Sequence, residues 1–172
     1  MFTRSGKTWT LDQVLSSDNP AEREQFGVSV AISGDTIVVG ADGNTHPSAE
    51  GAGSAYVYLR NNEIWSLQQK LISDDPEDGD ALGCPVDISG DTILLGAVGD
   101  DNSGYDGAGA AYTFTRSGGR WTQQQKLTSM YPAESDGFVF DNEKWGEPHR
   151  VAPFRIARTA VTQGEFAGFV DA

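Results

Sequence analysis

The chain has 172 residues, and its 12 lysines and arginines stand against 25 aspartates and glutamates, which leaves a formal net charge of −13. Such a polyanion repels phosphate backbones and anionic lipid headgroups, which excludes non-specific binding to nucleic acid or to a membrane surface. A hydrophobic content of 38% with 21 glycines favours short strands and many turns over a helical bundle. We therefore expect an acidic, β-rich chain with no nucleic-acid partner and no membrane insertion.

Targeting and redox features are sparse. Residues 1–6 lack the apolar core of a signal peptide, and no window approaches the apolar length of a bilayer span. The single cysteine, Cys84, excludes a disulfide within the chain. Stability is therefore expected to come from packing or from a partner.

An internal repeat organises most of the sequence. Trp9, Trp65 and Trp121 are spaced by 56 residues, and the segment Ser-Gly-Asp-Thr at residues 33–36 recurs at residues 89–92 with the same offset. A fixed period of this kind is typical of one supersecondary unit stacked on copies of itself. The three tryptophans could form a row on which a sugar stacks, but their recurrence at one strand position favours packing between copies.

Each repeat is predicted to form four strands. In the second copy they are residues 83–88, 92–96, 111–115 and 121–127, all rich in β-branched or aromatic residues and bounded by Gly, Asn, Asp or Ser. The short links between successive strands contain residues that tolerate positive φ, which favours hairpins. The fold class is therefore all-β, with four-stranded antiparallel repeats of 56 residues that resemble propeller blades.

The opening of each full copy resembles a known repeat family. Phe26 and Gly27, followed by VAISGDTIVVGA at residues 30–41, are similar to the FG-GAP repeat of bacterial surface proteins and of the integrin α-subunit head. The second copy has Leu82 in place of the phenylalanine. The resemblance implies a β-propeller, of extracellular or cell-surface location, whose loops bind protein or glycan ligands, sometimes with Ca²⁺.

The number of repeats predicts a partial β-propeller. Within residues 2–130 we expect a half-blade at 2–15 and two blades at 26–71 and 82–127, which makes about two and a half blades. Closed propellers need more blades, and an open stack leaves strand edges unpaired. Either the chain is a piece of a longer protein, or copies of it assemble through these edges; self-association is the expectation we favour.

A different segment follows at residues 131–172. Residues 138–172 are similar to the start of the formylglycine-generating, sulfatase-modifying-factor domain, which implies a short α+β tail. Thr162 and Glu165 form a capping box that predicts a short helix. The segment ends before the parts of that domain that carry its catalytic and metal-binding residues, so it transfers no activity to this chain.

One loop is a candidate metal site. Asp100, Asn102 and Asp106 are spaced as oxygen ligands for Ca²⁺, although Gly104 stands where a third carboxylate is expected. A solvated, turn-rich loop is the alternative. No other metal or cofactor is predicted.

The remaining reactive residues do not combine into a catalytic set. Cys84 replaces a valine of the first copy and is predicted to be a small buried hydrophobe, while His46 and His149 occur alone. The acidic connector at residues 74–80 is predicted to be a solvated loop without a pocket that would raise a carboxyl pKa.

The sequence therefore predicts a non-catalytic binding or adhesion module of FG-GAP type, with a protein or glycan ligand. Two alternatives stay open. The chain could be a self-assembling structural subunit that associates through open strand edges, or the N-terminal fragment of a formylglycine-generating-type enzyme.

Overall fold

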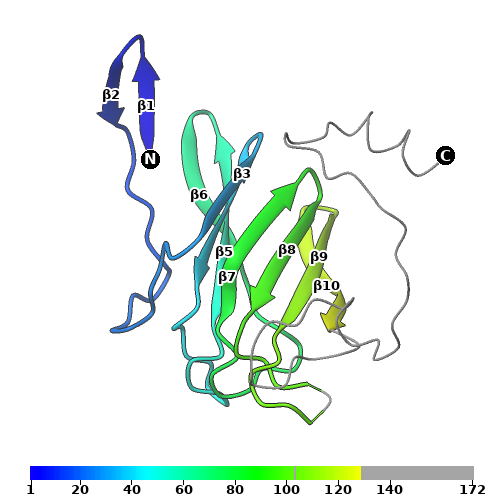
Figure 1. Ribbon diagram of the computed structural model, residues 1–172. Helices are drawn as coiled ribbons and strands as arrows, with labels where there is room; N and C mark the ends of the chain where they lie inside the picture. Colours follow the sequence, from blue (N-terminus) through cyan, green and yellow to red (C-terminus); the bar gives the residue numbers. More distant parts are fainter. Residues whose placement is uncertain (103, 129–172) are drawn as a thin grey trace, which may run out of the picture. The chain divides into compact units, whose positions relative to one another are not determined.

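The computed structural model describes residues 1–102 and 104–128, which all belong to one compact unit, Met1–Gly137. This part of the chain contains ten strands and no helix (Figure 1). The strands are β1 (Phe2–Ser5), β2 (Thr8–Leu11), β3 (Val30–Ser33), β4 (Thr36–Ala41), β5 (Ser54–Asn61), β6 (Ile64–Leu71), β7 (Leu82–Ser89), β8 (Thr92–Ala97), β9 (Ala110–Ser117) and β10 (Arg120–Thr128). The predicted all-β class is confirmed. The helix and strands predicted within residues 131–172 lie outside the described residues.

The strands form two antiparallel four-stranded sheets and one hairpin. Strands β3 to β6 pair in chain order, as do β7 to β10, while β1 pairs only with β2. We call the sheet β3–β6 blade 1, the sheet β7–β10 blade 2 and the hairpin β1–β2 the half-blade. The prediction of four-stranded, blade-like repeats is therefore confirmed.

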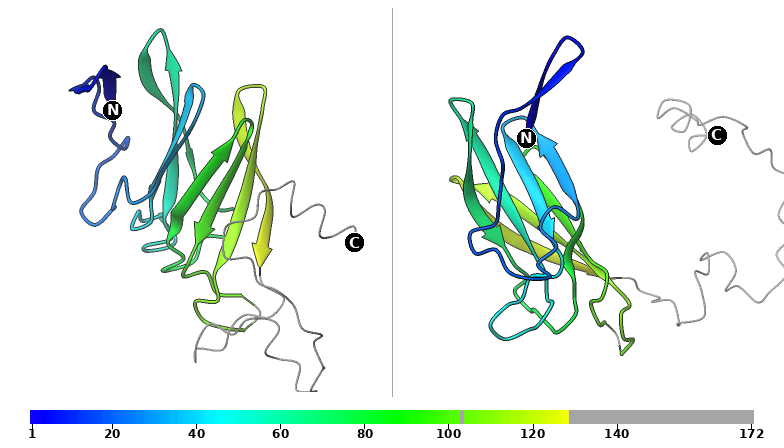
Figure 2. Two further views of the ribbon diagram at one scale, coloured as in Figure 1. Left: turned by 45° about the horizontal axis from the view of Figure 1, so that its top comes forward. Right: turned by 90° about the vertical axis from the view of Figure 1, so that its left-hand side faces the viewer.

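Tight turns join the strands because the linking residues accept positive φ. Asn62 and Glu63, between β5 and β6, have φ of 49° and 67°, and Gly118 and Gly119, between β9 and β10, have φ of 58° and 79°. Positive φ at both central residues is the pattern whose twist matches that of the flanking strands. Longer loops join β4 to β5 and β8 to β9, and both lie at the same end of their sheets (Figures 1 and 2). We call this end the loop end.

The main core lies between the two blades. Val38 and Leu71 of blade 1 share one apolar cluster with Ile88 and Trp121 of blade 2. Strand β7 packs across β3, β4 and β5. The approach is so close that a Cβ on Gly40 would lie 1.8 Å from the carbonyl oxygen of Gly83. Each blade therefore has a back face, turned toward the next blade along the chain, and a front face, turned toward the preceding one.

A second core covers part of the front face of blade 1. Tyr58 and Trp65 are buried there, and Met1, Leu15 and Phe26 of the N-terminal segment pack against this cluster. The N-terminal segment thus occupies part of the place that a full preceding blade would fill.

Candidate functional site

The back face of blade 2 is open, whereas the corresponding face of blade 1 is covered. Val38 and Leu71 of blade 1 are 0% and 2% exposed. Their counterparts 56 residues later, Leu94 and Leu127, are each 41% exposed. Because the two sheets share their topology, the difference in exposure shows how far a following blade buries the side chains of this face. Blade 2 has no such neighbour among the described residues.

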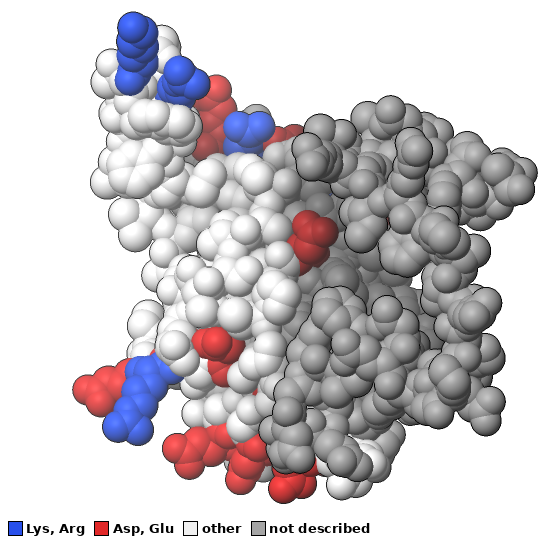
Figure 3. Space-filling view, viewed as in Figure 1, with Lys and Arg blue, Asp and Glu red and all other residues white. Residues whose placement is uncertain are grey.

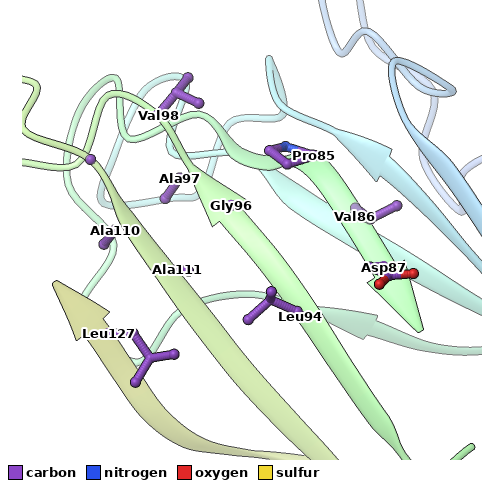
Figure 4. A pocket seen from close by; sticks show the side chains of 11 residues that line it. Pro85, Val86, Asp87, Leu94, Gly96, Ala97, Val98, Ala110, Ala111 and Leu127 are labelled. Atoms are coloured by element: carbon purple, nitrogen blue, oxygen red, sulfur yellow. The ribbon is translucent and has the colours of Figure 1, made fainter. Parts of the chain in front are cut away.

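The open back face of blade 2 is hollowed by an apolar groove of about 430 Å³. Leu94 on β8 and Leu127 on β10 project into this region, and Ala111 on β9 lies between them (Figure 4). A groove of this volume on a sheet face is large enough to receive side chains of another protein segment.

Polar residues distinguish this back face from its covered counterpart, and Thr115 in place of Leu59 is one of them. Asp87 and Thr113, which flank Leu94 in the register, take the places of Ala31 and Val57 in blade 1. The back face of blade 2 therefore mixes exposed leucines with a carboxylate and hydroxyl groups, whereas that of blade 1 is apolar at these positions.

The opposite flank of the unit is open as well. Trp121 is 1% exposed and Trp65 is 6% exposed, but Trp9, at the same repeat position, is 62% exposed. The prediction that the tryptophans pack between copies is confirmed for Trp121, which lies in the core between the blades. Trp65 is buried against the N-terminal segment instead, and for Trp9 the prediction is wrong. The physical reason is that no described strand lies in front of the half-blade.

The half-blade presents one amphipathic face. Phe2 pairs with Leu11 and Arg4 with Trp9, so these four side chains lie on the same side of the hairpin. All residues of β1 and β2 are exposed. In blade 2, Phe114 takes the place of Phe2 and is only 3% exposed.

A glutamine side chain locks each described blade to the next. The Gln13 side chain donates from Nε2 to the carbonyl oxygen of Trp65 at 2.6 Å and accepts from the Trp65 backbone N–H at 2.9 Å. Gln69 makes the same pair of bonds to Trp121, at 2.8 and 2.9 Å. Gln125 is the third glutamine of this series, and its side chain is exposed. This clamp was not predicted, although glutamine recurs at the 56-residue period at residues 13, 69 and 125.

A buried polar network lies at the loop end of blade 2. Asp100 is 1% exposed, and its Oδ2 accepts from the Tyr112 hydroxyl at 2.7 Å and from Lys126 Nζ at 2.8 Å. Lys126 also pairs with Asp75 Oδ2 at 2.9 Å. Burial alone lowers the pKa of Lys126, but the bonds to Asp100 and Asp75 raise it above its usual value. Burial and the bond to Asp100 raise the pKa of Tyr112. The tyrosine is thus held neutral and the lysine charged.

The loop end of blade 1 has a corresponding polar network made of different residues. Asn44 stands where blade 2 has Asp100, and its Oδ1 accepts from Lys70 Nζ at 2.7 Å. The carboxylate comes from Glu24, which accepts from Asn44 Nδ2 at 2.9 Å and from the Tyr56 hydroxyl at 2.7 Å. Burial raises the pKa of Glu24, but the hydrogen bonds from Tyr56 and Ser17 outweigh it and lower the pKa. Both networks therefore join strands of one blade to the segment that precedes that blade in the chain.

The predicted calcium ligands are only partly brought together. Asp100 and Asn102 each have an Oδ1 that is buried and without a hydrogen-bond partner, whereas Asp106 is exposed. Asn102 Nδ2 donates to the carbonyl oxygen of Gly109 at 2.8 Å, which orients its amide. In the part of the chain that the structure describes, no three His, Cys, Asp or Glu side chains form a group that could hold a metal ion. Calcium binding at this loop stays a prediction.

The acidic connector contains one buried carboxyl that the sequence prediction missed. Asp80 is 3% exposed, and burial together with the nearby charge of Asp100 raises its pKa. Its Oδ2 accepts from the backbone N–H of Glu77 at 2.8 Å. The rest of the connector is largely exposed, as predicted, and acidic side chains gather at the loop end in Figure 3.

The cysteine and the histidine among the described residues have contacts that suit a structural role. Cys84 is half-buried on β7, and His46 contacts the Ser48 hydroxyl at 2.8 Å in the β4–β5 loop. His149 lies outside the described residues. Across residues 1–102 and 104–128, no helix is long and apolar enough to cross a bilayer.

Comparison with known proteins identifies the repeat. The profile of the FG-GAP repeat matches residues 9–58 and 65–114, which together make up more than half of the chain. This match confirms the resemblance of the repeat region. No curated protein matches the chain. The resemblance of residues 138–172 to the sulfatase-modifying factor is not supported by the match.

Proposed function

Because the chain belongs to the FG-GAP repeat family, whose repeats are typically extracellular, we propose that it is a non-catalytic adhesion or binding module with a protein ligand, acting outside the cell. Its proposed binding surface is the open back face of blade 2. The observation that carries this proposal is the contrast between Leu94, 41% exposed, and Val38, 0% exposed, at the same repeat position. A sheet face that is covered by protein in one repeat is suited to protein rather than to a small molecule in the next.

The chemistry of the polar networks supports a module without catalysis. Lys126 has a raised pKa because of its bonds to Asp100 and Asp75, so it stays protonated at neutral pH. Tyr112 has a raised pKa because of burial and its bond to Asp100, so it stays neutral. A general acid or base works best with a pKa near the operating pH, and these shifts run in the opposite direction. We infer that the network stabilises the loop end.

The proposal can be tested with a neutral apolar dye. Nile red fluorescence should rise on addition of the dilute folded chain, and Leu94→Glu with Leu127→Glu should remove most of that rise. The matched control is Val14→Glu with Ile64→Glu, since these residues are 75% and 65% exposed but lie elsewhere. Equal fluorescence from the two double variants would mean that the back face is not an accessible apolar surface, and the proposal would then be wrong.

A second candidate property is calcium binding at the loop end. The buried, unpartnered Oδ1 atoms of Asp100 and Asn102 favour it, because buried oxygens without partners are costly unless a cation or a water satisfies them. Millimolar Ca²⁺ should then raise the thermal midpoint of the wild-type chain and leave that of Asn102→Leu unchanged, because a ligand stabilises the folded state to which it binds. An equal response to Ca²⁺ and to Mg²⁺, or none, would contradict it.

A further inference from the structure

We propose that the partner on the back face of blade 2 is the half-blade of a second copy of this chain, docked head to tail. This inference rests on the proposed function, because it uses the same surface and names its occupant. The contact would repeat the arrangement that β9 and β10 have on blade 1. One flank of each copy would thus meet the opposite flank of the next.

The first argument is the matching exposure of the two flanks. In blade 2, Phe114 and Trp121 are 3% and 1% exposed because blade 1 stands in front of them. In the half-blade, Phe2 and Trp9 occupy the same repeat positions and are 59% and 62% exposed. The half-blade therefore presents the residues that a back face covers, and blade 2 presents an uncovered back face.

The second argument is the unused glutamine clamp. Gln13 and Gln69 each bond both backbone groups of a tryptophan in the following repeat. Gln125 makes no such bond within the described residues, and the backbone of Trp9 receives none. A Gln125 amide on the Trp9 backbone of a second copy would complete the series in the register that the chain uses twice. Such paired bonds fix orientation as well as adding affinity.

The third argument is charge. The half-blade carries Arg4 and Lys7, both exposed, and no acidic residue between Phe2 and Leu11. The back face of blade 2 carries the exposed carboxylate of Asp87, on a chain whose net charge is −13. In Figure 3, basic side chains lie near the half-blade with acidic ones beside them, and further acidic side chains gather at the loop end. Opposite charges on the two surfaces favour their encounter and disfavour contact between like flanks.

The geometry of the contact predicts how it propagates. The two surfaces are different, so the interface is heterologous, and each added copy leaves one free half-blade and one free back face. Wild-type chains should therefore form rings or open chains of copies rather than stop at a dimer. An interface between two identical surfaces would instead give a dimer with no free binding surface.

The test uses sedimentation velocity on the full chain and on two single variants, Trp9→Glu and Leu127→Glu. The weight-average mass of the wild type should increase at least about twofold between about 1 and 100 µM, the range of a weak protein interface. Each variant alone should stay monomeric, because a charge at the centre of the contact weakens association by more than about tenfold. Both positions are exposed, so folding should survive, and circular dichroism checks it.

Mixing the two variants gives the decisive measurement. The Trp9→Glu chain keeps its back face, and the Leu127→Glu chain keeps its half-blade, so an equimolar mixture should form a dimer of one copy each and nothing larger. The controls Val14→Glu and Ile64→Glu should associate like the wild type.

Three results would overturn the head-to-tail contact. They are a wild type that stays monomeric at about 100 µM, association that survives both substitutions, and variants that do not complement each other when mixed. In each of these cases, dye binding that depends on Leu94 and Leu127 would leave the proposed function standing with another protein as ligand. Loss of that dye binding would remove the proposed function itself.

Discussion

Replacing Lys126 by methionine should destabilise the chain far more than the same change at Lys70. Lys126 Nζ lies 2.8 Å from Oδ2 of Asp100, whose side chain is only 2% exposed, so the substitution leaves a buried carboxylate without its cation. Removing one partner of a buried pair costs about 3–5 kcal/mol. We expect a value near the lower end because the Lys126 side chain itself is 27% exposed.

The control at Lys70 separates charge from packing. Lys70 Nζ bonds the neutral Oδ1 of Asn44 at 2.7 Å and lies 5.3 Å from the centre of the Tyr56 ring, much as Lys126 lies 5.4 Å from that of Tyr112. Losing a hydrogen bond to a neutral acceptor costs about 1–2 kcal/mol. The difference between the two variants is therefore expected to be about 1–2 kcal/mol and to report the buried carboxylate.

A rescue experiment completes this prediction. Asp100→Asn, which copies the residue of blade 1, should recover about 1–2 kcal/mol in the Lys126→Met background but cost stability in the wild type. Urea unfolding followed by tryptophan fluorescence compares the wild type with Lys70→Met, Lys126→Met, Asp100→Asn and the double variant of Lys126→Met with Asp100→Asn. Equal losses from Lys70→Met and Lys126→Met, or a further loss on adding Asp100→Asn, would refute the assignment of the cost to an uncompensated buried charge.

The remaining predictions concern the same blades. Trp121→Ala should cost about 3–5 kcal/mol in urea unfolding, whereas Trp9→Ala in dilute solution should cost less than about 1 kcal/mol, and similar losses would contradict the difference in burial. Gly40→Ala should lower the free energy of unfolding by several kcal/mol, because its Cβ would lie 1.8 Å from the carbonyl oxygen of Gly83. Amide hydrogen exchange should become faster in both blades. Unchanged exchange rates would show that the two blades do not pack this closely. Asp80→Asn should stabilise the chain at pH 7, because burial raises the pKa of Asp80 in the folded state, so the wild type loses stability as the pH rises through that pKa. The gain should vanish below about pH 3, where the wild-type carboxyl is protonated in both the folded and the unfolded state. A gain that persists at low pH would point to another cause.

Local sequence determined the strands and the repeat. Alternating β-branched and aromatic residues predict extended segments, and residues that accept positive φ, such as Gly118 and Gly119, predict the turns between them. These features depend only on neighbours along the chain. The period of 56 residues predicted the four-stranded blade, because similar repeated segments fold into the same unit. The family followed from the same local motif, and the profile match confirms it.

Only the tertiary structure decided which copies of a residue are buried and what each polar group contacts. Trp9 and Trp121 share a repeat position, yet one is 62% and the other 1% exposed, because burial depends on whether a blade stands in front. The bond from Gln69 to Trp121 joins residues far apart in the chain, and the burial of Asp80 arises where its connector meets other loops. Contacts of this kind depend on how one repeat packs on another, and the sequence of a single repeat does not specify which other repeat or segment lies against it.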